Sequence, residues 1–453
     1  MSQLFPGDFS LKSVKLYPVV ADGQQISKND YVDIKELVQE ISISESIISV
    51  SLYCQIVIKD IGNNLIGKLP LMGQERNEII VGSNDVEREL NFYIYKIDGR
   101  SMQEKNQIYV MHLTSLETLN NESERIMERV NGIKADVYLK QKFNRQVGST
   151  KNFTLKTFNA DSTLYPFDIY VPNWRLFDTA IWMSRRSVSP NYKNSIGFLF
   201  YETLDGYNFR SIDKLIDQTP YPNSSTKYTY LQGNTDSTKS SKLNYRILNY
   251  SSPKVFDVFD DLRNGAFCHN SIYVDITNRV CQTFKTNADQ YWDNMKHLEN
   301  LKPYRTKTEE KITHFPTRVV YRPTTINTFG WKELNPFKTP TDYVDNINSN
   351  YEKSIYRYYF LEYNKLEILI PGDLGLRAGS VIQISLPSPV RSSDGSVSED
   401  ERSSGKYLVH SVRHSILNRT ELTTTVTLTR DSFGGNKIAD QKNVGKQVNL
   451  GTK

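Results

Sequence analysis

Few residues in this sequence have the types and spacing that a reactive or metal-binding site requires. The nearest approach to a metal-ligating pair is His410 and His414, which lie four residues apart in the segment GKYLVHSVRHSI. This segment alternates like a β-strand, in which residues i and i+4 share a face but stand about 13 Å apart at ~3.3 Å per residue. One metal ion cannot be ligated directly across that distance. The spacing therefore predicts no metal site at these histidines.

Two other groups of reactive side chains favour structural roles. Cys268 and His269 are consecutive residues ahead of a predicted strand, so their side chains point to opposite faces and do not pair as nucleophile and base. Asp257, Asp260 and Asp261 crowd one predicted helix, but they lack the spacing and the closing glutamate of an EF-hand loop. We interpret these aspartates as a solvated acidic face.

The sequence contains no P-loop, GxGxxG, HExxH or GxSxG motif. Dispersed glutamates such as Glu45 and Glu75 keep a hydrolase open as an alternative, because a glycosidase needs two carboxylates about 5–9 Å apart and a sequence shows no distances. Because there is no other catalytic signature, we predict a protein that is not an enzyme, with no catalytic residue, no cofactor and no bound metal.

The composition indicates a β-rich protein without a strong net charge. The 453 residues include 28 tyrosines and 20 phenylalanines, and aromatic and β-branched residues favour strands. The 56 basic and 51 acidic residues leave a net charge of +5, which is too even for a dedicated nucleic-acid binder. Three cysteines without CxxC spacing, Cys54, Cys268 and Cys281, predict reduced thiols that fill the core.

The sequence predicts neither standard secretion nor a membrane anchor. The start, MSQLFPGDFSLKSVKL, lacks the basic and then apolar pattern of a signal peptide, and no run of about 18 apolar residues occurs. We expect a protein assembled in the cytoplasm of its host cell.

The N-terminal part alternates with the period of two that is typical of strands. Leu52, Cys54, Ile56 and Ile58 alternate with polar or outward residues, and further strands are predicted around 79–81, 90–94 and from Ile108. About 110 residues thus predict an antiparallel barrel or sandwich.

The middle of the chain predicts two helices and a hairpin. Ile126, Met127 and Val130 have the spacing of a short helix ended by Gly132. A second helix is predicted from Asn173 as N-cap, with one face formed by Trp174, Phe177, Ile181 and Ser184. Asp205-Gly206 then predicts the tight turn of an aromatic hairpin.

The C-terminal part predicts a long loop, a smaller helix and strand unit, and a second barrel. Residues 218–242 are rich in Pro, Ser, Thr and Asn and are typical of a loop. A helix closed by Gly265 precedes a strand, and residues 285–350 predict irregular structure. Alternating strands from LEILIPGD to TTTVTLTR predict a second antiparallel barrel, and residues 436–453 predict a flexible tail.

Three stretches resemble the baseplate hub, or tail hub, family of contractile-tailed bacteriophages. They are VPNWRLFDTAIWMSRRS with IGFLFYETLDGYNFRSIDKLI, then FDVFDDLRNGAFCHNSIYVDITNR, and finally LEILIPGDLGLRAGSVIQISLP with SGKYLVHSVRH and LTRDSFGG. The resemblance covers most of residues 10–435, with 218–242 and 285–350 matching poorly.

The resemblance implies a structural protein of the virion tail baseplate that forms a homotrimer. Each subunit of such a hub contributes two tube-type β-barrels, so that three chains form a pseudo-six-fold ring. The ring is a symmetry adaptor between the six-fold tail tube, or its initiator ring, and the three-fold central spike. Baseplate wedge proteins are further implied partners, and DNA passes through the channel without specific binding.

Together the pattern and the resemblance predict a β-rich α+β fold in five parts. These are a first tube-type barrel at 1–125, an α+β domain with the Trp-bearing helix at 126–205, a second barrel from 206–250 and 355–435, an inserted domain at 251–354, and the tail at 436–453.

The aromatic residues leave two questions open. Trp174, Phe177 and Trp182 either dock a neighbouring wedge or spike protein or form the core of the middle domain, and their helical spacing favours the core. The abundance of tyrosine and tryptophan also keeps a carbohydrate-binding tail module as an alternative function, beside a tail-associated hydrolase.

Overall fold

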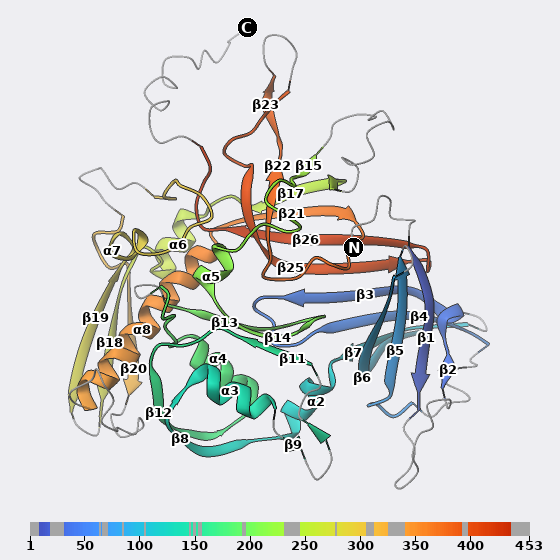
Figure 1. The fold of residues 1–453 in the computed structure, drawn as a ribbon, viewed down its shortest axis with the longest axis horizontal. Helices are drawn as coiled ribbons and strands as arrows, with labels where there is room; N and C mark the ends of the chain where they lie inside the picture. The colour runs from blue at the N-terminus through green and yellow to red at the C-terminus, as the bar shows by residue number, and fades with distance from the viewer. Residues whose placement is uncertain are drawn as a thin grey trace.

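A computed structural model describes residues 9–18, 31–62, 65, 71–83, 86–103, 106–144, 146–147, 151–152, 156–192, 196–230, 245–276, 279–304, 312–324, 340–391 and 397–435. The predicted flexible tail at 436–453 and residues 231–242 of the predicted loop lie outside this set. Within it, the fold is β-rich α+β, as predicted (Figure 1).

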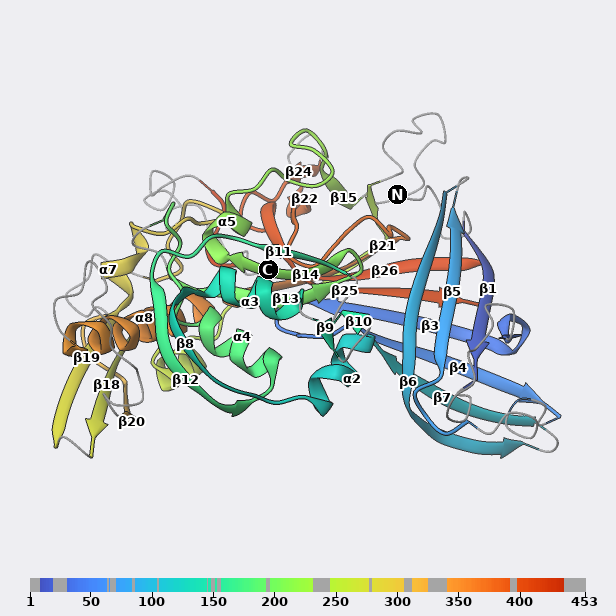
Figure 2. The same ribbon diagram turned by 60° about the horizontal axis from the view of Figure 1, so that its bottom comes forward.

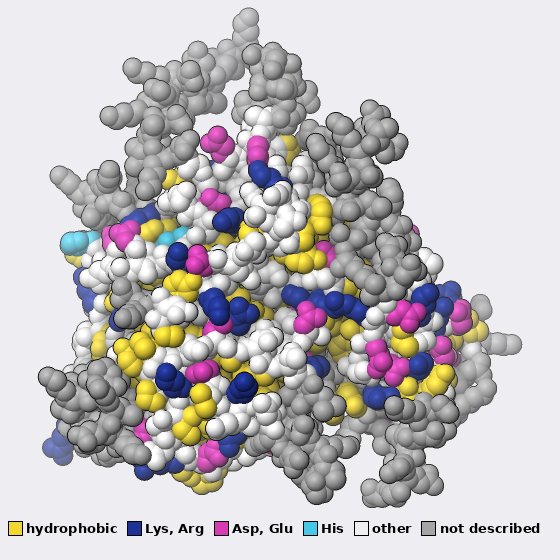
Figure 3. Space-filling view, viewed as in Figure 1, with side chains coloured by type: hydrophobic (Ala, Val, Ile, Leu, Met, Phe, Trp, Pro, Cys, Tyr) yellow, Lys and Arg dark blue, Asp and Glu magenta, His cyan; other side chains and the backbone are white. Residues whose placement is uncertain are grey.

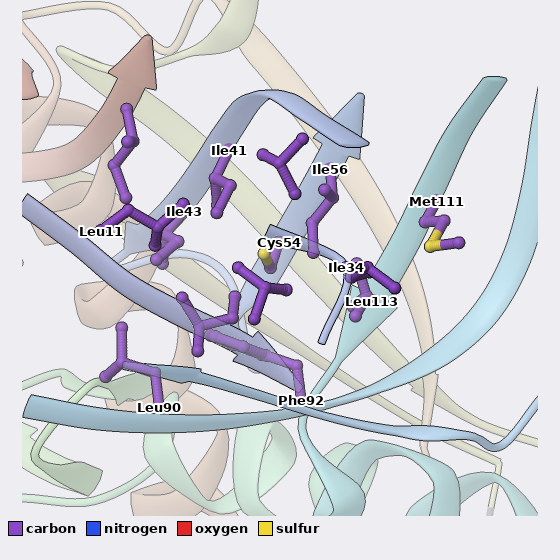
Figure 4. Packing of buried hydrophobic residues seen from close by; sticks show 14 of the residues in the cluster. Leu11, Ile34, Ile41, Ile43, Cys54, Ile56, Leu90, Phe92, Met111 and Leu113 are labelled. Atoms are coloured by element: carbon purple, nitrogen blue, oxygen red, sulfur yellow. The ribbon is translucent and has the colours of Figure 1, made fainter. Parts of the chain in front are cut away.

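The N-terminal part forms the strands that the alternation predicts. The elements are β1 (Ser10–Tyr17), β2 (Val32–Asp33), η1 (Lys35–Leu37), β3 (Val38–Ser46), β4 (Tyr53–Ile61), β5 (Arg76–Ser83), β6 (Val86–Gln103) and β7 (Asn106–Thr114). Their inward residues, including Ile43, Cys54, Ile56 and Phe92, pack into one apolar core (Figure 4). The period of two thus marks the buried face of each strand correctly.

The middle part contains four helices and several short sheets. Its elements are α2 (Leu116–Ser123), β8 (Ile126–Lys134), α3 (Ala135–Phe143), β9 (Gln146–Val147), β10 (Lys151–Asn152), β11 (Thr157–Ala160), β12 (Pro166–Trp174), α4 (Leu176–Ser184), β13 (Phe198–Thr203), β14 (Gly206–Ser211) and α5 (Ile212–Ile216). The predicted aromatic hairpin is confirmed as β13 and β14, with Gly206 at a φ of 138°.

Two predictions in this part are wrong. The helix predicted at Ile126, Met127 and Val130 is strand β8, which pairs with β12, and the helix lies earlier, as α2. Ile126 and Val130 are buried, but residues four apart share a face in a strand as well as in a helix, so their spacing did not distinguish the two. Asn173 is not the N-cap of α4, because it lies in β12 and the cap is Arg175.

The C-terminal part combines a small sheet, one long helix and the remaining long strands. Its elements are β15 (Tyr228–Tyr230), β16 (Arg246–Ile247), β17 (Asn249–Lys254), α6 (Val258–Asn264), β18 (Cys268–Asp275), β19 (Val280–Asn287), α7 (Ala288–Trp292), β20 (Arg318–Thr324), α8 (Pro340–Leu361), β21 (Asn364–Pro371), β22 (Val381–Ser385), β23 (Pro387–Arg391), β24 (Val397–Glu399), β25 (Gly405–Leu417) and β26 (Glu421–Arg430). Gly265 closes α6 in the left-handed conformation, as predicted.

The prediction of irregular structure over 285–350 is wrong for 285–292, 318–324 and 340–350, whereas 293–300 and 312–317 lie in turns and bends as predicted. This stretch holds α7, β20 and much of α8, a 22-residue helix that runs on to Leu361. Helix α8 buries Asn348, Asn350, Glu352 and Ser354 beside Tyr356, so its inner face is largely polar. That composition hides the apolar period by which a helix is recognised.

The long strands of both halves form one mixed sheet rather than two closed barrels. Its order is β16-β15-β22-β25-β3-β4-β7-β6-β5-β1-β2, with β26, β21 and β17 branching from β25. The described strands do not close into a barrel, which corrects the predicted pair of barrels. Figures 1 and 2 show β25 and β26 lying along β3, between the N-terminal strands and the rest of the C-terminal half.

Candidate channel and assembly surface

Strand β25 joins the two halves of the chain. Its residues 411–417 pair antiparallel with residues 40–46 of β3, whereas residues 405–408 pair with β22. Strand β26 pairs with β25 over residues 408–417. One strand therefore takes part in both halves, and backbone hydrogen bonds hold the halves together.

A β-bulge at His410 lets β25 change neighbours. The register with β26 shifts between Val409 and Ser411, and such a bulge bends a strand and increases its twist. The carbonyl oxygen of His410 accepts a hydrogen bond from the Ile47 N–H at 2.9 Å. Its ring Nε2 lies 3.1 Å from Glu362 Oε1, and this hydrogen bond lowers the pKa of Glu362 to about 2.

One side of the joined sheet is lined mainly by hydroxyl groups, and we call it the polar face. The strand registers place Ser46, Ser411, Thr427 and Glu367 side by side across four strands. The neighbouring rows hold Tyr53, Ser44, Arg413 and Thr425, then Gln55, Ser42, Ser415 and Thr423. A shallow groove of about 480 Å³ runs over these rows.

The polar face carries little net charge. Its positive group Arg413 donates to Ser42 Oγ at 2.7 Å and lies 4.0 Å from Glu40. Glu367 supplies a negative charge on the adjoining row. Elsewhere, the molecular face seen in Figure 3 shows basic and acidic groups interspersed. A polyanion near the polar face would therefore meet hydroxyl dipoles and balanced charges rather than a basic stripe.

A buried carboxylate fixes the underside of this junction. Glu45 of β3 accepts hydrogen bonds from the backbone N–H groups of Ala378 and Leu204, at 3.2 and 3.4 Å. Burial raises the pKa of Glu45 to about 7, although the nearby Arg377 opposes the shift. Arg377 in turn forms a two-bond pair with Asp205 at 2.7 and 2.8 Å. The β13–β14 turn, β3 and the loop before β22 are thereby tied together.

A second buried cluster, which we call the Arg357 cluster, connects α8 to the end of β26. The Arg357 guanidinium lies 2.8 Å from Asp431, 3.1 Å from Asp213 and 2.6 Å from the Lys296 carbonyl oxygen. His297 places one ring nitrogen 2.8 Å from Asp431 and the other 2.9 Å from the Trp292 carbonyl oxygen. His297 thereby links Asp431 to the backbone at Trp292.

The pKa values of the two aspartates in the Arg357 cluster shift in opposite directions. Burial alone would raise the pKa of Asp431, but the His297 hydrogen bond and the Arg357 charge outweigh it and hold that pKa well below its usual range. Burial raises the pKa of Asp213, with Arg357 opposing the shift. The Arg357 guanidinium therefore lies between two buried carboxylates and contacts both of them.

Glu352 of α8 holds the three-stranded β19-β18-β20 sheet. Its carboxylate receives hydrogen bonds from Ser271 at 2.6 Å, Tyr273 at 2.5 Å and Arg322 at 2.9 Å, and lies 3.2 Å from His269 Nε2. Burial alone would raise the pKa of Glu352, but these four groups lower it to about 2. Arg322 balances the charge of the carboxylate and the other three groups hydrogen-bond to it, which is a structural arrangement.

The histidines and cysteines singled out in the sequence take up separate structural positions. His414 is fully buried, lies 3.0 Å from Thr424 Oγ1 rather than near Glu362, and burial lowers its pKa to about 3. In the described part of the chain, no cluster of three or more His, Cys, Asp or Glu residues could hold a metal ion. Cys54 and Cys268 are buried free thiols, whereas Cys281 is exposed, so the prediction that all three fill the core is wrong for Cys281.

The acidic residues considered as candidates for a catalytic or metal site also lie in separate structural positions. Glu75 accepts hydrogen bonds from the Met72 and Gly73 N–H groups and shares no partner with Glu45, so both carboxylates hold backbone. Asp257 caps α6 by accepting from the Asp260 N–H. Asp261 is buried, which corrects the prediction of a fully solvated acidic face.

The aromatic residues Trp174, Phe177 and Trp182 belong to the core of the middle part. Phe177 is buried, and Trp174 and Trp182 are partly buried against the same cluster, with their rings 5.9 Å apart. Arg186 lies 4.1 Å from the Trp182 ring. The preferred core interpretation is supported.

The sequence did not reveal Arg357, Glu352 or the polar face. A lone Arg or Glu in a polar helix resembles a solvated residue, and only the run of Ser and Thr at alternate positions in β3 and β26 carried a readable signal. The pairing of β3 with β25 joins residues more than 360 positions apart, which local patterns do not encode.

No family model and no curated protein matches this chain. Among solved structures, the chain is similar to the 43 kDa tail protein of prophage MuSo2 from Shewanella oneidensis, with a TM-score of 0.51 and 9% identity over 93% of this chain and 99% of that one. It is also similar to the tail protein from Neisseria meningitidis MC58, with a TM-score of 0.49 and 10% identity over 93% and 97%.

A third similar structure is the E. coli c3393 protein, a type VI secretion component described as similar to the T4 bacteriophage tail proteins gp27 and gp5. It has a TM-score of 0.42 and 11% identity over 88% of this chain and 76% of that one. The likeness to the MuSo2 protein shows a shared fold. The predicted resemblance to phage tail proteins is therefore confirmed at the level of the fold.

Proposed function

We propose that this chain, which has the fold of a phage tail protein, is the structural hub of a contractile tail baseplate. It assembles as a homotrimeric ring, adapts the six-fold tail tube or its initiator ring to a three-fold central spike, and also contacts wedge proteins. It acts in the virion tail after assembly in the host cytoplasm. The observation that carries the proposal is the single sheet that spans both halves of the chain and presents one polar face.

The joined sheet suits a subunit that fills two positions of a ring. A three-fold ring between six-fold and three-fold partners must present a similar surface twice per chain, and closed rings use repeated heterologous contacts. Here the N-terminal and C-terminal halves each contribute long antiparallel strands, and β3 and β25 fix their relative rotation. The apolar clusters follow the five-part division only in outline, since the N-terminal cluster also contains Ile416 and Leu422 and the middle cluster also contains Tyr207 and Phe209.

The polar face suits the wall of a channel for DNA. Lysine and arginine clusters would neutralise phosphates and retain the polyanion. On the polar face the hydroxyls of Ser44, Ser411 and Thr427 have no net charge, and Arg413 is balanced by Glu40 and Glu367. We infer that DNA passes this surface without specific binding, and that the buried carboxylates hold structure rather than catalyse.

Light scattering after size-exclusion chromatography tests the ring. A species near three times 52.3 kDa with a central hole in negative stain is expected. A chain that stays monomeric even with a co-expressed spike protein would refute the trimer.

A gold label then tests the channel. In a Cys281→Ser background, Ser411→Cys places the only introduced thiol on the polar face, since Cys54 and Cys268 are buried. A maleimide gold cluster should appear at the axis of the ring. Gold at the outer rim would refute the assignment of the polar face to the channel.

A further inference from the structure

A large cleft lies away from the polar face, where four parts of the chain meet. Its volume is about 890 Å³, which is in the range of ligand sites. The turn after β3, the end of α4, the inner side of α8, and α6 with β20 form its walls.

The lining of the cleft is mainly apolar and aromatic. Ile181 of α4 and Ile355 of α8 contribute partly exposed aliphatic surface. Ile47 and Phe198 also line the cleft, but both are buried. Ile48 lies on the β3–β4 turn and is 63% exposed although it lines the cleft. Such a surface gains free energy when another apolar side chain covers it.

Two arginines on separate walls of the cleft are free to bind a carboxylate. Arg185 follows α4 and Arg318 begins β20, and both are exposed. Within the described residues neither has a carboxylate partner, whereas Lys254, Arg322 and Lys365 in the same lining are paired with Asp261, Glu352 and Glu362. Guanidinium groups bind carboxylates through paired hydrogen bonds, which gives both charge and geometric complementarity.

The cleft also contains a buried acceptor without a donor. Asp261 is 6% exposed, and its Oδ1 lies 3.4 Å from Lys254 Nζ. Its Oδ2 is buried and has no hydrogen-bond partner among the described atoms. A buried acceptor left unpaired costs about 1–3 kcal/mol, so a ligand that brings an N–H group would relieve this cost.

We propose that this cleft binds an extended segment of a partner protein in which a bulky apolar side chain lies next to an acidic residue. The apolar side chain would cover the surface around Ile48 and Ile181. The carboxylate would pair with Arg185 or Arg318, and a backbone N–H would donate to Asp261 Oδ2. Charge complementarity selects this occupant over a basic segment, and the inference does not depend on ring formation.

Fluorescence anisotropy on the full chain with a peptide panel tests this proposal. The probes are labelled nonapeptides whose two central positions are drawn from Phe, Leu, Ile and Trp, flanked by Glu, by Lys or by Ser. The Glu-flanked set should bind at least tenfold more tightly than the Lys-flanked and Ser-flanked sets. Equal binding of the three sets, or no binding of the Glu set at 1 mM, would overturn the proposal.

Three variants tie the binding to the cleft. The double variant Arg185→Glu with Arg318→Glu should weaken the binding of the Glu-flanked peptides at least tenfold. Ile48→Asp should also weaken their binding, although both arginines are still present. Lys134→Glu with Lys140→Glu makes the same charge change at exposed positions around α3 and serves as the matched control. If the control weakens binding as much as the arginine pair, the attraction is non-specific and the assignment fails.

Discussion

Removing Arg357 should release the contacts that hold α8 against the end of β26. Its guanidinium is fully buried and donates to Asp431, Asp213 and the Lys296 carbonyl oxygen. In Arg357→Ala the two carboxylates lose the guanidinium that both of them contact. Breaking a buried ion pair by removing one partner costs about 3–5 kcal/mol. At 1.4 kcal/mol per factor of ten, local opening should become roughly 140-fold to 3,700-fold more frequent.

Amide hydrogen exchange measures this opening by segment, which suits a protein of several parts for which a single unfolding free energy is poorly defined. The slow amides of α8, α5 and the end of β26 should exchange faster by that factor, while those of β4 and β7 should not change. Arg357→Lys keeps a charge but loses the planar fork, so its effect should be intermediate. Arg413→Ala, at an exposed arginine, should change the free energy of local opening by less than about 1 kcal/mol. If Arg357→Ala behaves like this control, the cluster does not hold the two elements together.

Four further changes test the structure. Burial raises the pKa of Glu45 to about 7. The stability that its protonated form contributes is therefore full below the unfolded pKa and is lost as pH rises through 7. Glu45→Gln should accordingly raise the thermal midpoint at pH 8 and not at pH 4. The pKa of Glu352 is lowered to about 2, so the stability that its carboxylate contributes is present above about pH 4.3 and is lost as pH falls toward 2. Glu352→Gln should lower the free energy of local opening by about 2–3 kcal/mol at pH 7, measured as faster amide hydrogen exchange in β18. Gly206→Ala would place a Cβ 2.4 Å from the Thr157 carbonyl oxygen at a φ of 138°, and should lower the thermal midpoint by an amount equivalent to about 2 kcal/mol. Trp174→Ala should cost about 2 kcal/mol in thermal unfolding, and a normally stable variant that fails only to recruit a partner would show a docking role instead.

Sequence patterns predicted the elements whose burial follows a simple period. The strand at 52–58 and the aromatic hairpin are present, because their inward residues are apolar. The helix closed by Gly265 is present as well, because its end adopts the left-handed conformation that favours glycine. Where one face of an element is polar but buried, the same method failed. Helix α8 shows this clearly, since Glu352 and Arg357 point inward to partners that are far away in the sequence.

The candidate surface was still less predictable from the sequence. Alternate Ser and Thr residues in β3 and β26 are readable, but the polar face exists only because β25 brings those two strands together. That pairing depends on the bulge at His410 and on contacts to Ile47 and Glu362. The prediction of two separate barrels failed for the same reason, since each half was considered without the strand that they share.

The distribution of charge argues that the two proposed surfaces have different tasks. Buried carboxylates such as Asp431 and Glu352 are matched by cations from other elements, so they stabilise the arrangement of the parts. Charges on the polar face are balanced locally, which leaves no site to retain a polyanion. Arg185 and Arg318, by contrast, have no carboxylate partner among the described residues and lie beside an apolar surface, where an acidic partner can pair with them. A stable complex at the cleft should therefore weaken with salt when the partner is acidic, whereas the joined sheet, held by backbone hydrogen bonds and buried pairs, should not.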